Sequence, residues 1–182
     1  MNLKSRKRQF VVFAILSLLM FLVYSNSIPQ IFIWNVTASV PKGLYLIVER
    51  KPSELHVGDY VSFKPTAEAL NWISENVEDQ KVIDHLDSLI FLKQVGAMSG
   101  DTYEIVSDSK MFYAKDKYIG QASEVTDTGN KLPVLRGKYI VPDGMFLPVG
   151  ENPNSFDGRY TGPVKIENVI YRVIPIFIEF HW

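Results

Sequence analysis

The sequence predicts a mainly β fold, an antiparallel and partly closed barrel or sandwich, with one helical insertion and an N-terminal transmembrane helix. From residue 35 onward, short β-branched and aromatic segments such as Leu44–Val48 and Tyr60–Phe63 alternate with turns. Residues 67–89 instead place apolar side chains near helical spacing among acidic ones, which indicates an amphipathic helical insertion. Residues 10–24 contain no charged side chain.

The uncharged segment predicts a membrane anchor. As a helix, residues 10–24 would reach about 22 Å, less than a hydrocarbon core of about 30 Å. The next charged residue comes after position 34, so a tilted or kinked span ending near Trp34 is expected. A basic cluster precedes this segment and gives residues 1–34 a charge of +4, from Lys4, Arg6, Lys7 and Arg8. By the positive-inside rule, this tip lies in the cytoplasm and the rest of the chain on the other side.

A cleaved signal peptide is the alternative interpretation of this end of the chain. Val36 and Ala38 are small residues at the −3 and −1 positions before Ser39, but the polar stretch between the apolar segment and this site is too long for a signal peptide. We therefore expect two parts: residues 1–34, a cytoplasmic basic tip and transmembrane anchor, and residues 35–182, a periplasmic domain.

Charge and composition exclude several function classes. Residues 35–182 carry a net charge of −5, which argues against nucleic acid as a partner. The chain has no cysteine, which excludes a disulfide scaffold, a thiol nucleophile and a Cys-ligated metal. We expect neither a metal nor a cofactor.

The remaining segments complete the predicted β domain. Polar and turn-forming residues over 115–137 predict a mobile surface loop. The apolar C-terminal segment 169–182 contains Arg172, Pro175 and Glu179, so a closing strand is expected there rather than a second membrane helix. Further strands are predicted at residues 89–95, 102–106, 110–114, 139–142 and 145–149.

Three segments contain candidate chemical groups. Ser39 lies in a tight turn between residues 35 and 45, where an ordinary loop is the alternative. Lys93 lies in an apolar strand; burial there would lower the pKa of its amine and make it a general base, whereas a lysine at a strand edge would reach solvent. Residues 150–163 form a polar, Gly-rich turn in which Asp157 and Arg159 could pair, although an ordinary surface loop has the same composition.

Taken together, these segments resemble the type I signal peptidases, membrane-bound serine proteases that use a serine–lysine dyad. The order matches: anchor, serine, a Gly-Asp strand at residues 57–61, Leu-Lys-Gln-Val at 92–95, then the closing segments at 139–146 and 154–162. The spacing around Ser39 is similar to that of the TraF branch, the conjugative-transfer peptidases that process pilin precursors. Two departures from the ordinary family pattern are Glu151, where aspartate is usual, and Gly158, where serine is frequent.

The resemblance implies a signal-peptidase-type fold and a role for each candidate residue. Ser39 would be the nucleophile and Lys93 the general base, while the Thr37 hydroxyl and the Ser39 backbone N–H would stabilise the oxyanion. Ser155 would orient Lys93, and Asp157 with Arg159 would support the loop behind it.

The expected function is therefore a serine endopeptidase of the inner membrane, with a single span, a cytoplasmic N-terminus and a periplasmic catalytic domain. Its expected partners are a precursor pilin or another membrane-associated preprotein, and components of conjugation or type IV secretion. Cleavage coupled to pilin cyclisation and simple hydrolysis both fit. The alternatives are a housekeeping signal peptidase and a non-catalytic, anchored β domain that acts as an assembly factor.

Overall fold

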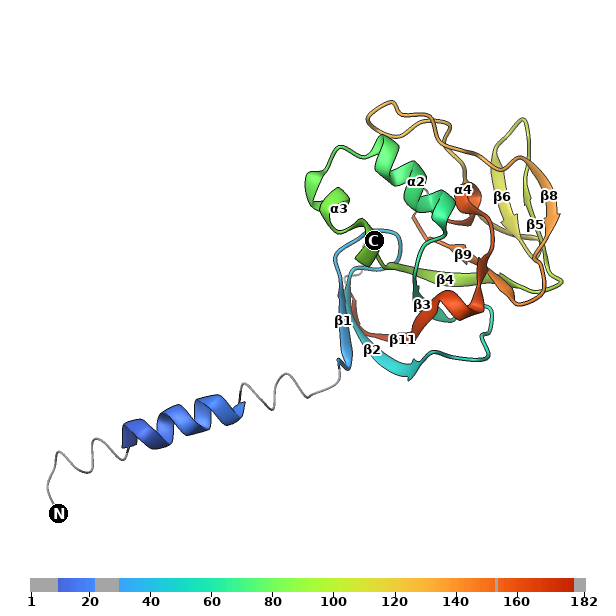
Figure 1. Ribbon diagram of the computed structural model, residues 1–182. Coiled ribbons are helices and arrows are strands. Elements are labelled where there is room, and N and C mark those ends of the chain that lie inside the picture. The colour runs from blue at the N-terminus through green and yellow to red at the C-terminus, as the bar shows by residue number, and fades with distance from the viewer. Residues whose placement is uncertain (1–9, 22–29, 153, 179–182) are drawn as a thin grey trace, which may run out of the picture. The chain divides into compact units, whose positions relative to one another are not determined.

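The computed structural model describes residues 10–21, 30–152 and 154–178, and it divides into two compact units. The first unit covers residues 1–31, of which residues 10–21 form an exposed helix (Figure 1). Within the described residues, no helix combines the length and apolarity needed to cross a bilayer. Residues 1–9 and 22–29 of the predicted anchor lie outside the described residues.

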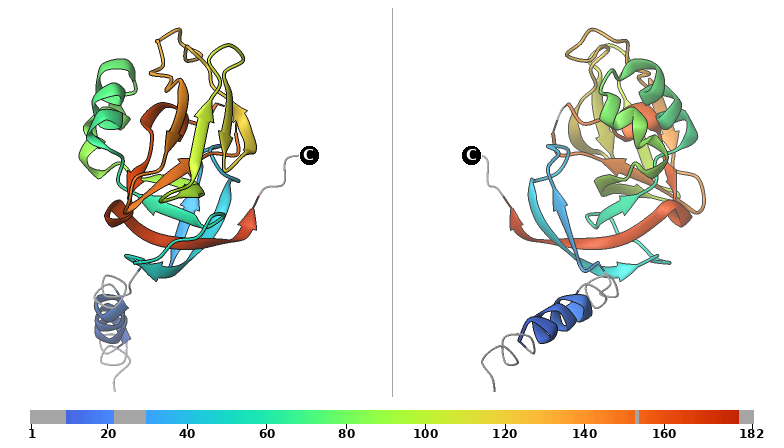
Figure 2. Two further views of the ribbon diagram at one scale, coloured as in Figure 1. Left: turned by 90° about the vertical axis from the view of Figure 1, so that its right-hand side faces the viewer. Right: turned by 60° about the vertical axis from the view of Figure 1, so that its left-hand side comes forward.

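The second unit, residues 32–182, is mainly β, as the sequence predicts. Its larger sheet is antiparallel and has seven strands in the order β1-β2-β11-β3-β4-β9-β10. Figure 2 shows how this sheet curls, with the long β11 bending across it. In chain order, these strands are β1 Phe32–Asn35, β2 Gly43–Arg50, β3 Tyr60–Phe63, β4 Phe91–Met98, β9 Met145–Val149, β10 Val164–Lys165 and β11 Val169–Ile178.

The smaller sheet is also antiparallel and has four strands in the order β7-β6-β5-β8. Its strands are β5 Thr102–Ile105, β6 Met111–Ala114, β7 Lys117–Gln121 and β8 Gly137–Ile140. The largest hydrophobic core lies between this sheet and β9. Its fully buried members include Ile105, Phe112 and Leu147.

Strand β7 corrects the prediction of a loop throughout residues 115–137. Lys115 and Asp116 both have positive φ, 50° and 61°, and they connect β6 to β7 in a tight hairpin. Such turns usually contain Asn-Gly or Asp-Gly, so Lys-Asp gave no hairpin signal. The polar residues of β7 fit an outer strand, because β7 pairs with β6 on one side only.

The helical insertion is confirmed and consists of α2 Ala67–Asn76, α3 Gln80–Asp84 and a 3₁₀ turn, Leu86–Ser88. Helix α2 begins after Thr66, whose side chain accepts a hydrogen bond from Ala69 N, as a helix N-cap should. Its buried side chains are Ala69 and Ile73. The remaining short elements are α4 Gly158–Thr161 and the 3₁₀ turn Ile166–Asn168.

Strand β1 contains residues 32–34, which the prediction placed in the anchor. They pair antiparallel with β2, in a register that sets Asn35 opposite Gly43. Apolar residues of a strand and of a membrane span look alike over so few positions, so composition could not locate this boundary.

Candidate active site

The turn that carries Ser39 connects β1 to β2 and is held by Asn35. The Asn35 side chain is buried, with 6% of its surface exposed. Its Oδ1 accepts hydrogen bonds from Thr37 N at 3.1 Å and Thr37 Oγ1 at 2.8 Å. Its Nδ2 donates to the carbonyl oxygens of Thr37, Val40 and Pro41, at 2.9, 3.3 and 3.1 Å. One side chain thus satisfies main-chain groups on both sides of Ser39.

Ser39 is half-buried, and its main chain contacts the Gly-rich loop of residues 150–157. The Ser39 carbonyl oxygen accepts a hydrogen bond from Glu151 N at 2.8 Å. On the other side of the turn, the buried Val40 packs against Tyr45, whose hydroxyl donates to Pro41 O at 2.7 Å. The turn is therefore fixed both to β2 and to the loop.

Lys93 lies on β4 opposite Val61 of β3, and only 4% of its surface is exposed. Its Nζ donates a hydrogen bond to Ser155 Oγ at 2.7 Å and lies 5.5 Å from the centre of the Phe91 ring. Burial disfavours the charged ammonium and lowers the pKa of Lys93 to about 8, although the Asp157 carboxylate partly opposes this effect. A substantial fraction of Lys93 is then neutral in mildly alkaline solution and able to accept a proton.

Asp157 and Arg159 form a fully buried ion pair that organises the loop. Asp157 accepts hydrogen bonds from Arg159 Nε at 2.9 Å, Arg159 Nη2 at 2.8 Å and Gly150 N at 2.6 Å. The guanidinium also donates to the carbonyl oxygens of Gln121 and Asn152. Because both charges are paired and hydrogen-bonded, the pair can remain ionised without water.

Gly150 lies between the Ser155 side chain and the main chain of Ser39. A Cβ atom at this position would overlap the Ser155 side chain and lie 2.9 Å from the Ser39 carbonyl oxygen. The absence of a side chain at position 150 therefore lets Ser155 approach the Ser39 turn.

The structure brings together five of the six predicted site residues in a connected network. Ser155 contacts Lys93, Asp157 pairs with Arg159, and the Ser39 main chain bonds to the residue after Gly150. Within the described residues, however, no hydrogen bond joins Ser39 Oγ to Lys93 Nζ. Thr37 is exposed, and its hydroxyl donates a hydrogen bond to Asn35. To contact an oxyanion as predicted, the hydroxyl would have to give up this bond and donate to the oxyanion instead.

Sequence reasoning assigned no role to Asn35, Gly150 or Glu151. An asparagine directly before a turn is a usable signal, because its amide can bond to the main chain two residues on. Tyr60 donates a hydrogen bond to Glu151 Oε1 at 2.5 Å, and burial together with this carboxylate raises the pKa of the Tyr60 hydroxyl. This contact joins residues 91 positions apart, which no local pattern reveals.

The described residues contain no group of three or more His, Asp or Glu side chains able to hold a metal ion. The network offers a hydroxyl, an amine of lowered pKa and main-chain N–H groups, which together suit acyl transfer.

Comparison with known proteins agrees with this chemistry. A family model described as signal peptidase, peptidase S26, matches residues 5–178. The search of curated proteins finds no match. With nearly the whole length matched and a serine-peptidase type of chemistry available, the chain belongs to the signal peptidase family, peptidase S26.

Proposed function

We propose that this signal peptidase is a membrane-anchored serine endopeptidase in which Ser39 is the nucleophile and Lys93 the general base. One observation carries the proposal: Lys93 is buried, its pKa is lowered to about 8, and its amine is held by Ser155 beside the loop that contacts Ser39. A buried lysine with a lowered pKa is suited to remove the proton of a serine hydroxyl.

The proposed reaction proceeds in two stages. Neutral Lys93 accepts the proton of Ser39 Oγ while this oxygen attacks the scissile carbonyl carbon, and the carbonyl oxygen becomes an oxyanion. Main-chain N–H of Ser39 and the Thr37 hydroxyl, released from Asn35, stabilise this charge; such a donor typically contributes about 3–4 kcal/mol. Lys93 then gives its proton to the leaving amine. In the second stage, water or an amine attacks the acyl carbon and gives a proton to Lys93, which passes it to Ser39 Oγ as the ester bond breaks.

The proposed substrate is the precursor of a conjugative pilin or a related exported protein. The support is the sequence around Ser39, with Thr37, Pro41, Gly43 and Tyr45 spaced as in the TraF branch. A precursor would bind in extended form along the strands next to the site. If the precursor's own amino terminus attacks the acyl-enzyme, the product is a cyclic pilin; if water attacks, the product is linear.

The proposed location is the inner membrane, with the N-terminus in the cytoplasm and the catalytic domain in the periplasm. The support is the basic cluster at residues 4–8, followed by the uncharged residues 10–31 that precede strand β1. Conjugation or type IV secretion components are the proposed neighbours. A housekeeping signal peptidase is the second candidate, favoured by the family match itself, and it would cleave unrelated preproteins.

The deciding experiment is precursor processing in cells that carry Ser39→Ala or Lys93→Ala. Neither variant is expected to mature the precursor, even when it is produced at the wild-type level. Ser39→Ala removes the hydroxyl that gives the proton, and Lys93→Ala removes the amine that accepts it. Lys165→Ala is the matched control, since Lys165 is exposed and pairs only with the exposed Glu167 within the described residues. Maturation by either dyad variant would overturn the assignment and favour a non-catalytic assembly factor.

Substrate identity needs a second measurement. The wild-type chain is given pilin precursors and unrelated preproteins side by side, and the products are weighed by mass spectrometry. A product lighter than the linear chain by one water indicates cyclisation. Equal cleavage of unrelated preproteins would replace the pilin proposal with the housekeeping one.

A further inference from the structure

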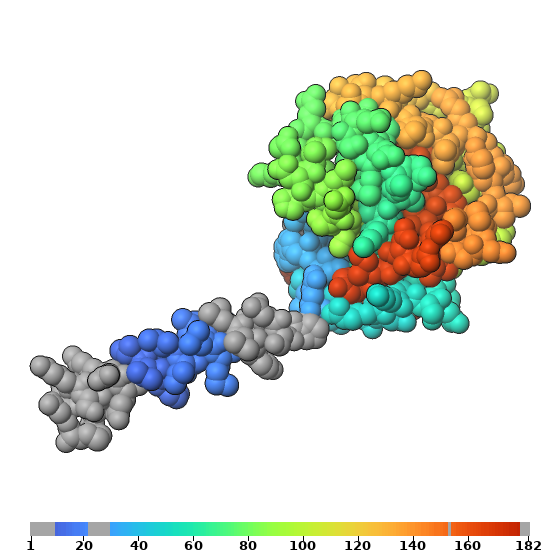
Figure 3. All heavy atoms as spheres, in the orientation of Figure 1, coloured from blue at the N-terminus to red at the C-terminus, as the bar shows by residue number. Residues whose placement is uncertain are grey.

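A side chain of the helical insertion, Trp72 of α2, contacts the site loop. The Trp72 ring stacks on Phe156, with ring centres 4.8 Å apart and planes inclined by 25°. Phe156 directly follows Ser155, the residue that holds Lys93. On the face shown in Figure 3, the green insertion adjoins the red-orange C-terminal segment.

Phe156 is the centre of a larger aromatic cluster. It stacks on Tyr160, with ring centres 5.6 Å apart and planes inclined by 7°, and it meets Phe91 edge-on at 6.5 Å. Phe91 lies beneath the Lys93 amine. The rings therefore form a continuous set of contacts from the insertion to both sides of the Lys93–Ser155 hydrogen bond.

Two hydrogen bonds hold the insertion against residues 123–132. Trp72 Nε1 donates to Lys131 O at 3.2 Å, and Asn130 Nδ2 donates to Asn76 O at 2.7 Å. On the other side, the Tyr160 hydroxyl accepts a hydrogen bond from Ser123 N at 2.8 Å. Helix α2, residues 123–132 and the site loop thus support one another.

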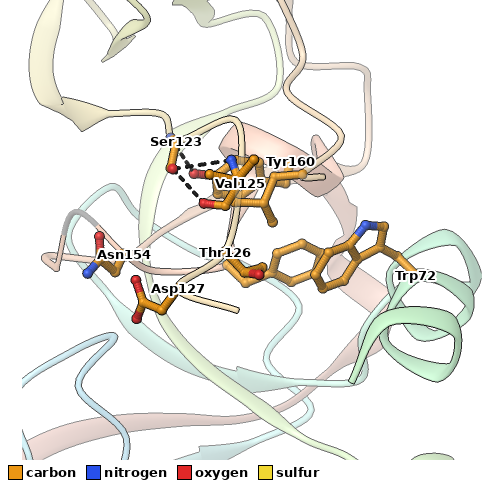
Figure 4. Close-up of a pocket in the computed structure, with 9 residues that line it drawn as sticks. Trp72, Ser123, Val125, Thr126, Asp127, Asn154 and Tyr160 are labelled. Carbon is orange, nitrogen blue, oxygen red and sulfur yellow. Dashed lines mark hydrogen bonds between the residues drawn. The ribbon is translucent and has the colours of Figure 1, made fainter. Parts of the chain in front are cut away.

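These three segments line a pocket of about 170 Å³ that is open to solvent. Figure 4 shows Trp72 extending from its helix toward Thr126, with Tyr160 and Val125 on the neighbouring wall. Because open space lies on this side of Phe156, the Phe156 ring can move into it when Trp72 is shortened. Tyr160 and Phe91 also contact the Phe156 ring, and the Trp72 stack restrains it on the side of the pocket.

We propose that Trp72 is a positioning residue, and that the helical insertion serves to hold Phe156, and through it Ser155, against Lys93. The inference rests on the proposed serine–lysine chemistry and gives the insertion its function. Within the part of the chain that the structure describes, no hydrogen bond or ring contact joins Trp72 to Ser39 or Lys93, and Trp72 acts through the backbone that Phe156 shares with Ser155.

Loosening the stack has a specific consequence for Lys93. The charged groups that act on its amine are Asp157 and Arg159 of the site loop, and burial is the strongest influence. If Ser155 and Phe156 shift, water reaches the amine, burial decreases and the pKa of Lys93 rises toward its ordinary value. A smaller fraction of the enzyme then carries a neutral base near neutral pH.

The test compares Trp72→Leu with Trp72→Phe in the full chain, by measuring kcat/KM for a precursor peptide against pH. For Trp72→Leu, the acid limb should move up by about one pH unit, which lowers kcat/KM at pH 7 about tenfold and leaves high-pH activity and KM little changed. Trp72→Phe keeps an aromatic face and should restore most of the wild-type profile. The control is Ser74→Ala on the same helix, an exposed residue whose hydroxyl donates to Asn71 O, and it should keep the wild-type pH profile.

Heteronuclear NMR titration of the Lys93 Nζ provides a readout that does not depend on cleavage. Its midpoint should rise in Trp72→Leu and in Phe156→Leu, which breaks the same stack from the loop side. If the midpoint and the acid limb stay at wild-type values in both folded variants, Trp72 has only a structural role and the inference is overturned. The dyad proposal would survive that result, because it is judged by the Ser39 and Lys93 variants.

Discussion

At the scale of single residues, Lys93 is held in an environment that opposes its own charge. Lys93 is 4% exposed, Ser155 supplies its amine with a neutral hydroxyl, and the Asp157 carboxylate is already shared with Arg159. Such an arrangement costs folding free energy while the lysine is protonated. The same arrangement makes the amine a usable base. Functional sites commonly lose stability in this way while they gain activity.

This cost predicts how stability depends on pH. The folded pKa of about 8 lies below the ordinary value of 10.5, so the penalty is complete below pH 8 and is relieved as pH rises from 8 to 10.5. Lys93→Met removes the charge and should raise the free energy of unfolding at pH 7 by up to roughly 3 kcal/mol. Urea unfolding of both proteins from pH 7 to pH 10 checks this. If the difference in the free energy of unfolding between the two proteins does not shrink as pH rises, the buried charge of Lys93 is not its cause.

The buried ion pair predicts a loss of stability of different origin. Asp157→Asn keeps the shape but leaves the Arg159 guanidinium, which is 0% exposed, without its carboxylate. We expect a loss of about 3–5 kcal/mol in the free energy of unfolding. Glu167→Gln, which breaks the exposed pair with Lys165, should change it by less than about 1 kcal/mol. Comparable losses in the two variants would show that burial does not determine how much the Asp157–Arg159 pair contributes to the free energy of unfolding.

At the scale of elements, the β1–β2 connection depends on Asn35 more than on strand pairing. Strand β1 has four residues and forms the edge of the larger sheet, while the turn after it is held by the Asn35 amide. A short edge strand can shift along its partner unless its turn is fixed.

Asn35→Ala should therefore impair activity more than folding. The substitution removes hydrogen bonds to a buried side chain, which should lower the free energy of unfolding by about 1–3 kcal/mol. At a temperature where the variant is still folded, kcat/KM should fall at least about tenfold, because a misplaced nucleophile loses its alignment. The control is Asn71→Ala on the exposed side of α2. Wild-type kcat/KM in the folded Asn35 variant would exclude this role.

At the scale of the whole molecule, the described β unit has its own buried clusters from residue 32 onward, and residues 10–21 form a separate helix with exposed apolar side chains. Exposed apolar side chains in such number call for a covering environment. A bilayer around this helix, as in the proposed membrane anchor, would supply one.

The proposed topology can be tested because the chain has no cysteine of its own. Ser107→Cys introduces a thiol at an exposed position of the β unit, and Ser5→Cys introduces one in the basic tip. In intact spheroplasts, a membrane-impermeant maleimide should label the first variant and spare the second until the membrane is permeabilised. Labelling of Ser5→Cys from outside would reverse the proposed orientation, and protection of both would place the β unit in the cytoplasm.

Most of the fold was predictable because periodicity and turn chemistry are local properties. The strands containing Tyr60–Phe63 and Met145–Val149 follow from residue type and flanking turns, and the insertion around residues 67–89 follows from side-chain spacing. Strand β7 was missed because its turn, Lys115–Asp116, relies on positive φ values that the hairpin context stabilises. The first residues of β1 were given to the anchor because pairing with β2, and not composition, makes them a strand.

The sequence by itself determined the mainly β class, the insertion, the basic end and the residues from which a serine–lysine site could be assembled. Only the tertiary structure decided that Lys93 is buried against Ser155, that Asn35 holds the Ser39 turn, and that Trp72 stacks on the site loop. The physical reason is distance along the chain. Lys93 bonds to Ser155, which is 62 positions away, and the charges that act on its pKa, Asp157 and Arg159, lie further still along the chain. These groups meet only when the sheet curls and the loops pack upon it.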